Sequence, residues 1–384
     1  MRNRLSEPLN MALVGAALHA VDAGHRTPLR RGRRVRQLLD ILLAACLLAL
    51  VGAAGLARAQ GGSTVIHDIE SAAIADNQMG IAALRRVLVY LPRGYADTRR
   101  SYPVLYWIPG WETPASREYV AGLDAAIDKR WIPEAIVVIV DVREGLVLLN
   151  STVFGRWEEF VTDEVIPLID GEYRTIPDAR GRAIMGHSTG GYGALMLALL
   201  HPGVWSAVGL NDASVWAGCT VPWQEFPEDM RSAPEASGFI RAWMQVAIAI
   251  APNPEAPLLF DMPTEGKDGW ISDPRWQPYC LLRADSLDMY RETLRDMSTI
   301  QVLVPRRGGP TNAMPNVTMW HGMTSLGVSG AFTEMPGTHG GDRVNRFVLL
   351  ARRILPVLAD AFPDVRAQTT TWGRIRRRLG DGTP

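Results

Sequence analysis

The stretch Gly186-His187-Ser188-Thr189-Gly190 decides the fold of this 384-residue chain. It follows a short apolar run, Ala183-Ile184-Met185, and precedes the small and apolar residues 191–197. The G-x-S-x-G spacing predicts a sharp strand-to-helix turn, because a side chain at either glycine would collide with neighbouring backbone. Such a turn presents the Ser188 hydroxyl above a sheet. The pattern therefore predicts a nucleophile at Ser188, with an ordinary helix N-cap serine as the alternative.

Further short apolar runs recur along the chain and predict the strands of a buried sheet. Runs of this kind are typical of strands covered on both faces, which are mostly parallel. Between them, residues 156–169 and 344–358 carry apolar side chains at helical spacing. The alternation predicts a doubly wound α/β fold with a mostly parallel sheet. The expected strands are residues 87–91, 104–108, 135–140, 183–185, 206–210, 300–304 and 331–335.

The composition is that of an ordinary globular protein and gives no sign of a nucleic-acid partner. Apolar residues make up 47% of the chain and charged residues 21%, as in a globular protein with a large core. The formal net charge is zero, so nothing favours a nucleic-acid partner. The sequence contains no metal-ligand spacing, P-loop or dinucleotide fingerprint, and we expect neither a metal nor a cofactor.

Residues 1–59 predict an N-terminal extension and a secretion signal. Arginines within 30–36 precede an apolar run at 38–56, and Ala57-Arg58-Ala59 offers an A-x-A cleavage site before Gln60. We therefore expect an exported protein, periplasmic or extracellular, with no stable membrane span after cleavage. An uncleaved signal anchor is the alternative, since about 20 apolar residues can span a bilayer.

The remaining chain predicts one α/β domain at 60–365 and a basic tail at 366–384. Within the domain, residues 213–295 are rich in proline and tryptophan and have no strand pattern, which predicts a partly helical cap over the catalytic face. Its tryptophans either line an apolar pocket or pack the cap onto the domain. In an exported chain, Cys219 and Cys280 either form a disulfide or remain two buried thiols.

Five segments in a fixed order carry a family resemblance over residues 63–362. They are Val89–Tyr95, Tyr102–Tyr106, Phe160–Pro167 with Tyr173–Thr175, the serine turn, and Glu334–His339. In this order and spacing the chain resembles the putative-esterase branch of the α/β-hydrolases. That branch includes S-formylglutathione hydrolases, enterochelin esterases, feruloyl esterases and mycolyltransferase antigens.

The resemblance implies roles for three further residues. His339 stands at the G-x-H position of the branch and would be the general base for Ser188. Pro109-Gly110-Trp111 stands where the branch has His-Gly after its first central strand. The backbone N–H groups of Trp111 and Thr189 would then form the oxyanion hole, a role that a backbone group keeps when its side chain changes.

The acid of a catalytic triad is missing from its usual place. The branch carries it after the strand that precedes the histidine strand, but Arg306–Asn312 contains no carboxylate. Asp212, after the strand expected at 206–210, is the best substitute, because some α/β-hydrolases place their acid there. Asp285 and Asp288 are alternatives, as is a Ser–His dyad without an acid.

These residues predict an exported serine esterase of the carboxylesterase type. It would cleave a small-molecule or glycan-linked ester through an acyl-enzyme on Ser188. Two alternatives remain: an acyltransferase that passes the acyl group to a sugar or alcohol, and a hydrolase-like binding protein with weakened catalysis. The sequence makes no prediction of the oligomeric state or of the acyl group.

Overall fold

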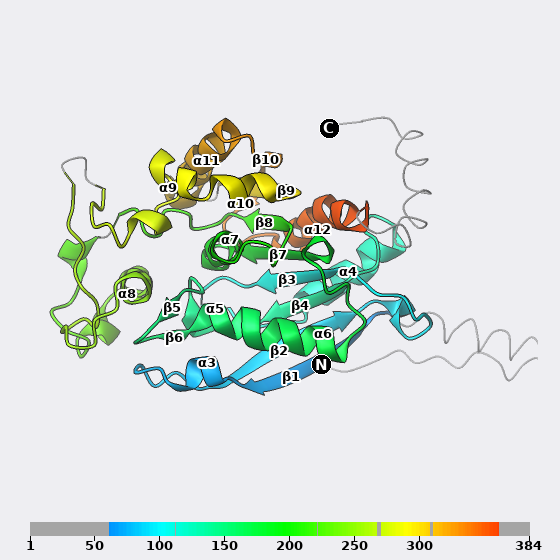
Figure 1. The fold of residues 1–384 in the computed structure, drawn as a ribbon, viewed down its shortest axis with the longest axis horizontal. Coiled ribbons are helices and arrows are strands. Elements are labelled where there is room, and N and C mark those ends of the chain that lie inside the picture. Colours follow the sequence, from blue (N-terminus) through cyan, green and yellow to red (C-terminus); the bar gives the residue numbers. More distant parts are fainter. Residues whose placement is uncertain (1–60, 112, 221, 267–269, 308–309, 361–384) are drawn as a thin grey trace, which may run out of the picture. The chain divides into compact units, whose positions relative to one another are not determined.

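The structure is a computed structural model that describes residues 61–360, apart from 112, 221, 267–269 and 308–309. The predicted N-terminal extension and signal, residues 1–59, and the basic tail, residues 366–384, lie outside the described residues. Figure 1 shows a central sheet with helices packed on it.

The described residues form a sheet of eight strands and a separate two-stranded hairpin. The strands of the main sheet are β1 (Ser63–Glu70), β2 (Leu84–Leu91), β3 (Val104–Ile108), β4 (Ile136–Val140), β7 (Arg182–His187), β8 (Ala207–Asn211), β9 (Thr299–Arg307) and β10 (Gly330–Thr338). The hairpin consists of β5 (Asn150–Ser151) and β6 (Gly155–Arg156).

The strand order is β1-β2-β4-β3-β7-β8-β9-β10. Strand β2 runs antiparallel to β1 and β4, and every other neighbouring pair is parallel. The mostly parallel α/β sheet is therefore confirmed, and each of the seven expected strands is present. The eighth strand, β1, was not predicted; its exposed and half-buried residues give it no continuous apolar run.

The helices cover both faces of the sheet. They are α3 (Ala72–Ala75), α4 (Glu118–Asp128), α5 (Trp157–Glu159), a π-helical stretch (Phe160–Val165), α6 (Ile166–Glu172), α7 (Thr189–Leu200), α8 (Gly238–Ile250), α9 (Ala284–Met289), α10 (Arg291–Asp296), α11 (Pro310–Ser325) and α12 (Arg343–Asp360). The expected helix at 156–169 is the segment from α5 to α6, and the one at 344–358 is α12.

Two hydrophobic clusters, one on each face, explain the apolar strand runs. In β3, Val104 and Tyr106 belong to one cluster, which includes α5, α7 and α8. Leu105 and Trp107 belong to the other, which includes α4 and α12. Because successive side chains of a strand point to opposite faces, a strand buried on both sides must be apolar at every position.

The expected cap segment connects β8 to β9 in the sequence. It contains α8, α9 and α10 with short 3₁₀ turns, and its described residues form isolated β-bridges instead of a strand. Its tryptophans differ in setting: Trp276 is fully buried, whereas Trp216 is half-buried and contacts other aromatic rings.

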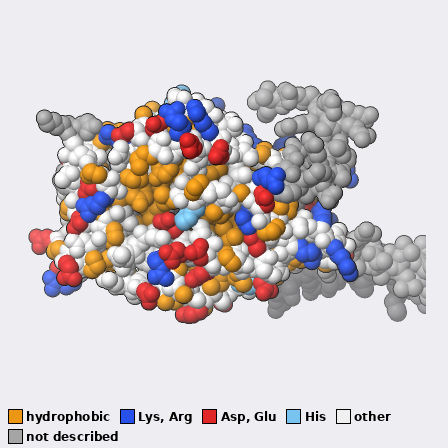
Figure 2. All heavy atoms as spheres, in the orientation of Figure 1, with side chains coloured by type: hydrophobic (Ala, Val, Ile, Leu, Met, Phe, Trp, Pro, Cys, Tyr) orange, Lys and Arg blue, Asp and Glu red, His pale blue; other side chains and the backbone are white. Residues whose placement is uncertain are grey.

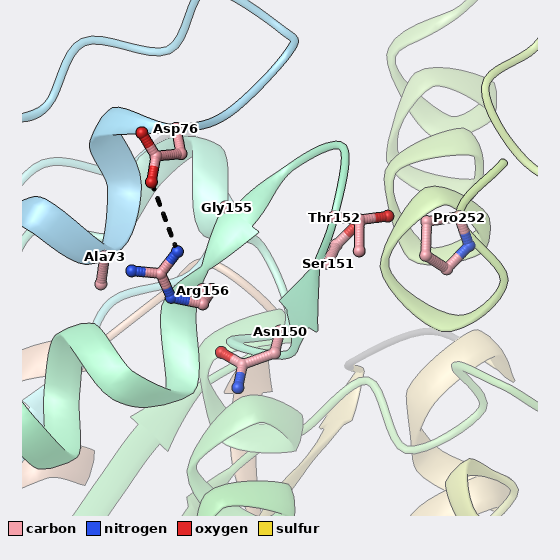
Figure 3. Close-up of a pocket in the computed structure, with 8 residues that line it drawn as sticks. All are labelled: Ala73, Asp76, Asn150, Ser151, Thr152, Gly155, Arg156 and Pro252. Atoms are coloured by element: carbon pink, nitrogen blue, oxygen red, sulfur yellow. Dashed lines mark ion pairs between the residues drawn. The ribbon is translucent and has the colours of Figure 1, made fainter. Parts of the chain in front are cut away.

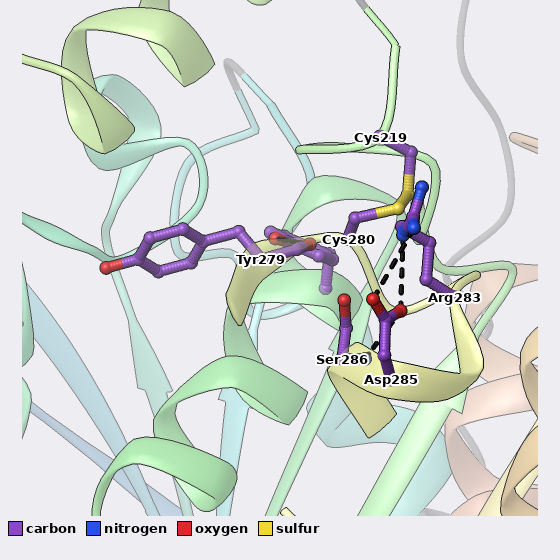
Figure 4. Close-up of a disulfide and its surroundings, with 7 residues drawn as sticks. Cys219, Tyr279, Cys280, Arg283, Asp285 and Ser286 are labelled. Carbon is purple, nitrogen blue, oxygen red and sulfur yellow. Dashed lines mark hydrogen bonds and ion pairs between the residues drawn. A yellow bond between two sulfur atoms is a disulfide. The ribbon is translucent and has the colours of Figure 1, made fainter. Parts of the chain in front are cut away.

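Cys219 and Cys280 form a disulfide within this segment (Figure 4). The Cys219 N–H donates a hydrogen bond to the carbonyl of Trp216. Beside Cys280, the Tyr279 carbonyl accepts a hydrogen bond from the Tyr192 hydroxyl of α7, with the two oxygens 2.7 Å apart. The disulfide therefore joins the chain around Trp216 to a segment docked on α7.

Candidate active site

Ser188 lies at the turn between β7 and α7, and its backbone is held in an unusual conformation. Its φ is 55° and its ψ is −123°, a region that residues with a side chain rarely adopt. The Ser188 N–H donates to the Asn211 carbonyl, and the Ser214 N–H donates to the Ser188 carbonyl. Contacts with the next strand and the chain beyond it thus hold the turn.

The two glycines of the motif allow backbone segments to approach one another closely. A Cβ at Gly186 would lie 2.2 Å from the Gly190 carbonyl oxygen. A Cβ at Gly190 would lie 2.1 Å from the Pro109 carbonyl oxygen. Both distances are far below van der Waals contact with rigid backbone, so the structure requires glycine at both positions for the reason the sequence suggested.

His339 directly follows β10 and contacts the serine. Its Nε2 lies 3.0 Å from Ser188 Oγ. The histidine loop is held by Arg346 of α12, whose guanidinium donates hydrogen bonds to the carbonyls of His339 and Gly341. Arg346 is 1% exposed, and this burial lowers its pKa from the ordinary value. A buried arginine thus fixes the backbone that carries the imidazole.

Asp212 directly follows β8 and contacts the other nitrogen of the same imidazole. Its Oδ2 lies 2.6 Å from His339 Nδ1, and its side chain is fully buried. Its φ is 49°, and its N–H donates to the Leu303 carbonyl at 2.7 Å. Ser188, His339 and Asp212 therefore form one continuous chain of contacts at the carboxyl edge of the parallel strands.

The alternative acids lie elsewhere. Asp285 pairs with Arg283, and Asp288 pairs with Arg291, both on exposed parts of the cap segment. The structure thus brings Asp212, and neither alternative, to His339.

Two further polar residues, which carry no catalytic motif in the sequence, also belong to this group. The Ser214 hydroxyl lies 3.2 Å from Ser188 Oγ. Asn312, near the start of α11, contacts both Asp212 and His339 through its side-chain amide. Asn312 ends the segment 306–312, where the branch carries its acid, and that position was the available signal for it.

His187 is a neighbour of the site and does not contact the serine hydroxyl. Its Nδ1 pairs with the Asn211 carbonyl at 3.0 Å, and its ring centroid lies 4.7 Å from that of His339. Burial, together with the nearby His339, lowers the pKa of His187 to about 3. The imidazole of His187 is therefore neutral at ordinary pH.

The two expected oxyanion donors lie in segments that adjoin the serine turn. Thr189 is the first residue of α7 and is buried. A Cβ at Gly110, next to Trp111, would lie 3.2 Å from the Cβ of Ser188. The Trp111 ring packs against the start of α8, where a Cβ at Gly238 would lie 3.1 Å from it.

Aromatic rings of the cap segment approach the catalytic groups through Trp216. The Trp216 indole N–H donates to the Asn312 side-chain oxygen at 2.7 Å. Its ring centroid lies 4.3 Å from that of Trp243 and 6.0 Å from that of Phe239, which is 49% exposed. An aromatic group thus extends from the surface of α8 to the residues around His339.

Other features of the described chain lie apart from this site. Lys/Arg and Asp/Glu side chains intermingle on the face shown in Figure 2, in keeping with the zero net charge. A hollow of about 380 Å³ beside the β5–β6 hairpin is lined by Asp76, Arg156 and neighbouring residues, which do not include the catalytic group (Figure 3).

Among residues 61–360 that are described, no cluster of three His, Cys, Asp or Glu could hold a metal ion. The same residues contain no helix long and apolar enough to cross a membrane.

Comparison with known proteins agrees with this geometry. Residues 81–270 match the family described as "Putative esterase". An esterase of Mycobacterium tuberculosis is 32% identical over 124 residues, which are 30% of this chain and 26% of that protein. An endo-1,4-beta-xylanase/feruloyl esterase of Xylanibacter ruminicola is 31% identical over 134 residues, which are 32% of this chain and 18% of that protein. The chain therefore matches about a quarter or less of the length of these curated relatives.

Solved structures share the fold. A ferulic acid esterase superposes with a TM-score of 0.56 at 19% sequence identity, covering 78% of this chain and 99% of that one. A fluorophosphonate-binding serine hydrolase of Staphylococcus aureus superposes with a TM-score of 0.52 at 13% identity, again covering 78% and 99%. Both have the α/β-hydrolase architecture, and the sheet of this chain has it too.

Proposed function

Because the chain belongs to the putative esterase family of α/β-hydrolases, we propose that it is an exported serine esterase in which Ser188 forms an acyl-enzyme. One observation carries the proposal most strongly. His339 lies within hydrogen-bond distance of Ser188 Oγ through one ring nitrogen and of Asp212 through the other. A nucleophile, a base and a buried carboxylate in this sequence of contacts are the parts that acyl transfer needs.

In the first half of the reaction, His339 Nε2 takes the Ser188 hydroxyl proton as Oγ attacks the ester carbonyl carbon. The backbone N–H groups of Trp111 and Thr189 stabilise the negative charge that develops on the carbonyl oxygen. Asp212 holds the Nδ1–H tautomer and stabilises the imidazolium. The imidazolium then gives its proton to the leaving alkoxide oxygen as the C–O bond breaks, leaving the acyl group on Ser188.

In the second half, water replaces the alcohol. His339 takes a proton from water while the water oxygen attacks the acyl carbon. When the second tetrahedral intermediate collapses, the bond to Ser188 Oγ breaks and the proton returns from His339 to that oxygen. The products are a carboxylic acid and the free enzyme, so protons and electrons balance without a cofactor.

We propose export because the sequence before Gln60 has the order of a secretion signal and because the domain carries a disulfide. Disulfides persist in oxidising compartments, and the bond between Cys219 and Cys280 is in keeping with such a location. The substrate we propose is a small-molecule or glycan-linked ester. The aromatic rings of Trp216 and Phe239, and the feruloyl esterase among the relatives, make aromatic acyl esters the first class to assay.

Labelling by a fluorophosphonate and hydrolysis of p-nitrophenyl and feruloyl esters test the proposal. Ser188→Ala abolishes labelling and lowers kcat by about six orders of magnitude, because the nucleophile is lost. Asp212→Asn lowers kcat by about four orders of magnitude and leaves the fold intact. Ser214→Ala, which removes the neighbouring hydroxyl, is the matched control and still takes the label. Hydrolysis by Ser188→Ala at the wild-type rate would refute the proposal.

A further inference from the structure

Asn312 is a buried amide that joins three parts of the active site. Its side-chain nitrogen donates to the backbone carbonyl of Asp212 at 3.1 Å and lies 3.2 Å from His339 Nδ1. Its side-chain oxygen accepts the indole N–H of Trp216 at 2.7 Å. The residue is 6% exposed, so these contacts are shielded from solvent.

The indole of Trp216 fixes which end of the Asn312 amide faces the histidine. An indole nitrogen is a donor only, so the amide oxygen must face Trp216 and the NH₂ group must face Asp212 and His339. An NH₂ group cannot accept a proton from His339 Nδ1. The Asp212 carboxylate, 2.6 Å away, is therefore the acceptor for that N–H.

Asn312 also restrains the backbone that carries the acid. Asp212 has a φ of 49°, and its second carboxylate oxygen, Oδ1, has no hydrogen-bond partner among the described residues. The carboxylate is therefore positioned mainly by its backbone and by His339. One helical turn along α11, Asn316 donates to the carbonyl of Ala213 at 2.6 Å. Residues four apart on a helix lie on one face, so Asn312 and Asn316 together hold two consecutive carbonyls.

We propose that Asn312 is a positioning residue of the esterase: it holds Asp212 in place, directs the Nδ1–H of His339 to that carboxylate, and couples the pair to Trp216. The inference rests on the proposed function. It has a second consequence: position 312 is close enough to His339 for a carboxylate placed there to replace that of Asp212.

The first test separates positioning from stability. Asn312→Ala lowers kcat by about 10- to 100-fold and changes KM by less than about threefold, because the substrate contacts remain while the imidazole is misplaced. Asn316→Ala is the matched control, since it loses a carbonyl contact of the same kind without touching His339, and its kcat falls less. Trp216→Phe keeps an aromatic ring but removes the indole N–H that Asn312 accepts, and it lowers kcat as Asn312→Ala does. A kcat within about twofold of wild type for folded Asn312→Ala would overturn the proposal.

The second test moves the acid and does not depend on the stability of Asn312→Ala. Asp212→Asn combined with Asn312→Asp recovers at least about tenfold of the kcat lost in Asp212→Asn alone, because the new carboxylate meets His339 Nδ1. Asp212→Asn combined with Asn316→Asp recovers nothing. A double variant at 212 and 312 that is no faster than Asp212→Asn would overturn the second consequence, that a carboxylate at position 312 can replace that of Asp212. Wild-type activity in Asp212→Asn itself would refute the role of Asp212 and with it this inference, whereas wild-type activity in Ser188→Ala would refute the proposed function.

Discussion

At the scale of single residues, His187 links the active site to the pH dependence of stability. Burial and the nearby His339 lower its pKa to about 3 in the folded protein, against an ordinary value of 6.5 in the unfolded chain. Between these values the unfolded chain binds a proton that the folded protein does not. The free energy of unfolding therefore falls on acidification, by about 1.4 kcal/mol per pH unit from this residue.

Replacing His187 with Asn removes this dependence and keeps a donor for the Asn211 carbonyl. We expect the free energy of unfolding of His187→Asn, from urea titrations at about pH 6 and about pH 4, to fall less steeply than that of wild type. His201→Asn serves as the control, because His201 is half-buried and pairs with Glu158 away from the site. Equal slopes for wild type and His187→Asn would contradict the assignment.

The residues of the site differed in how far the sequence could predict them. Ser188 and His339 carry motifs and a fixed order along the chain, and the structure places them in contact. Asp212 was one of several candidate acids, because no local pattern says which strand end faces the histidine; the topology, with β8 beside β7, decides that. Asn312 had no chemical motif, and its role depends on contacts with three distant segments.

At the scale of elements, the disulfide joins two parts of the cap segment, one of which is docked on α7. Cys219 and Cys280 enclose a loop whose ends are 61 residues apart in sequence. We expect the double variant Cys219→Ser/Cys280→Ser to lose about 2–4 kcal/mol of unfolding free energy, because the unfolded chain is no longer constrained. Urea unfolding measures the loss. Dithiothreitol should destabilise wild type and leave the stability of the double variant unchanged. If the variant had the same urea midpoint of unfolding as wild type, the expectation would be contradicted.

The elements themselves divide into predictable and unpredictable ones. The central strands are buried on both faces, so each appears in the sequence as an unbroken apolar run. Strand β1 lies at the edge of the sheet and, among the described residues, pairs only with β2. Because its residues are exposed or half-buried, its sequence lacks an unbroken apolar run. Helix α11 contains Pro315 and has no marked apolar face, and it too was not predicted. Packing, more than local preference, determines both elements.

At the scale of the whole molecule, the main prediction concerns the cellular location of the protein. We expect the mature protein to begin at Gln60 and to be recovered from the periplasmic or extracellular fraction. Amino-terminal sequencing of that fraction measures this directly. Replacing Ala57 and Ala59 with Leu should block cleavage, because the peptidase requires small residues there, and should leave the protein bound to membranes. Recovery of the intact chain from the cytoplasm, with no shorter form, would contradict export.

Ser188 and Asp212 share a strained backbone conformation, and this strain lowers the stability of the folded protein. Both are non-glycine residues with positive φ, 55° and 49°, at the ends of neighbouring strands. Each such conformation costs about 1–3 kcal/mol, which glycine would largely avoid. On the criterion of backbone strain alone, glycine would be favoured at both positions. The Ser188 and Asp212 side chains thus stand where the backbone disfavours a side chain, so activity at this edge of the sheet comes at a cost in stability.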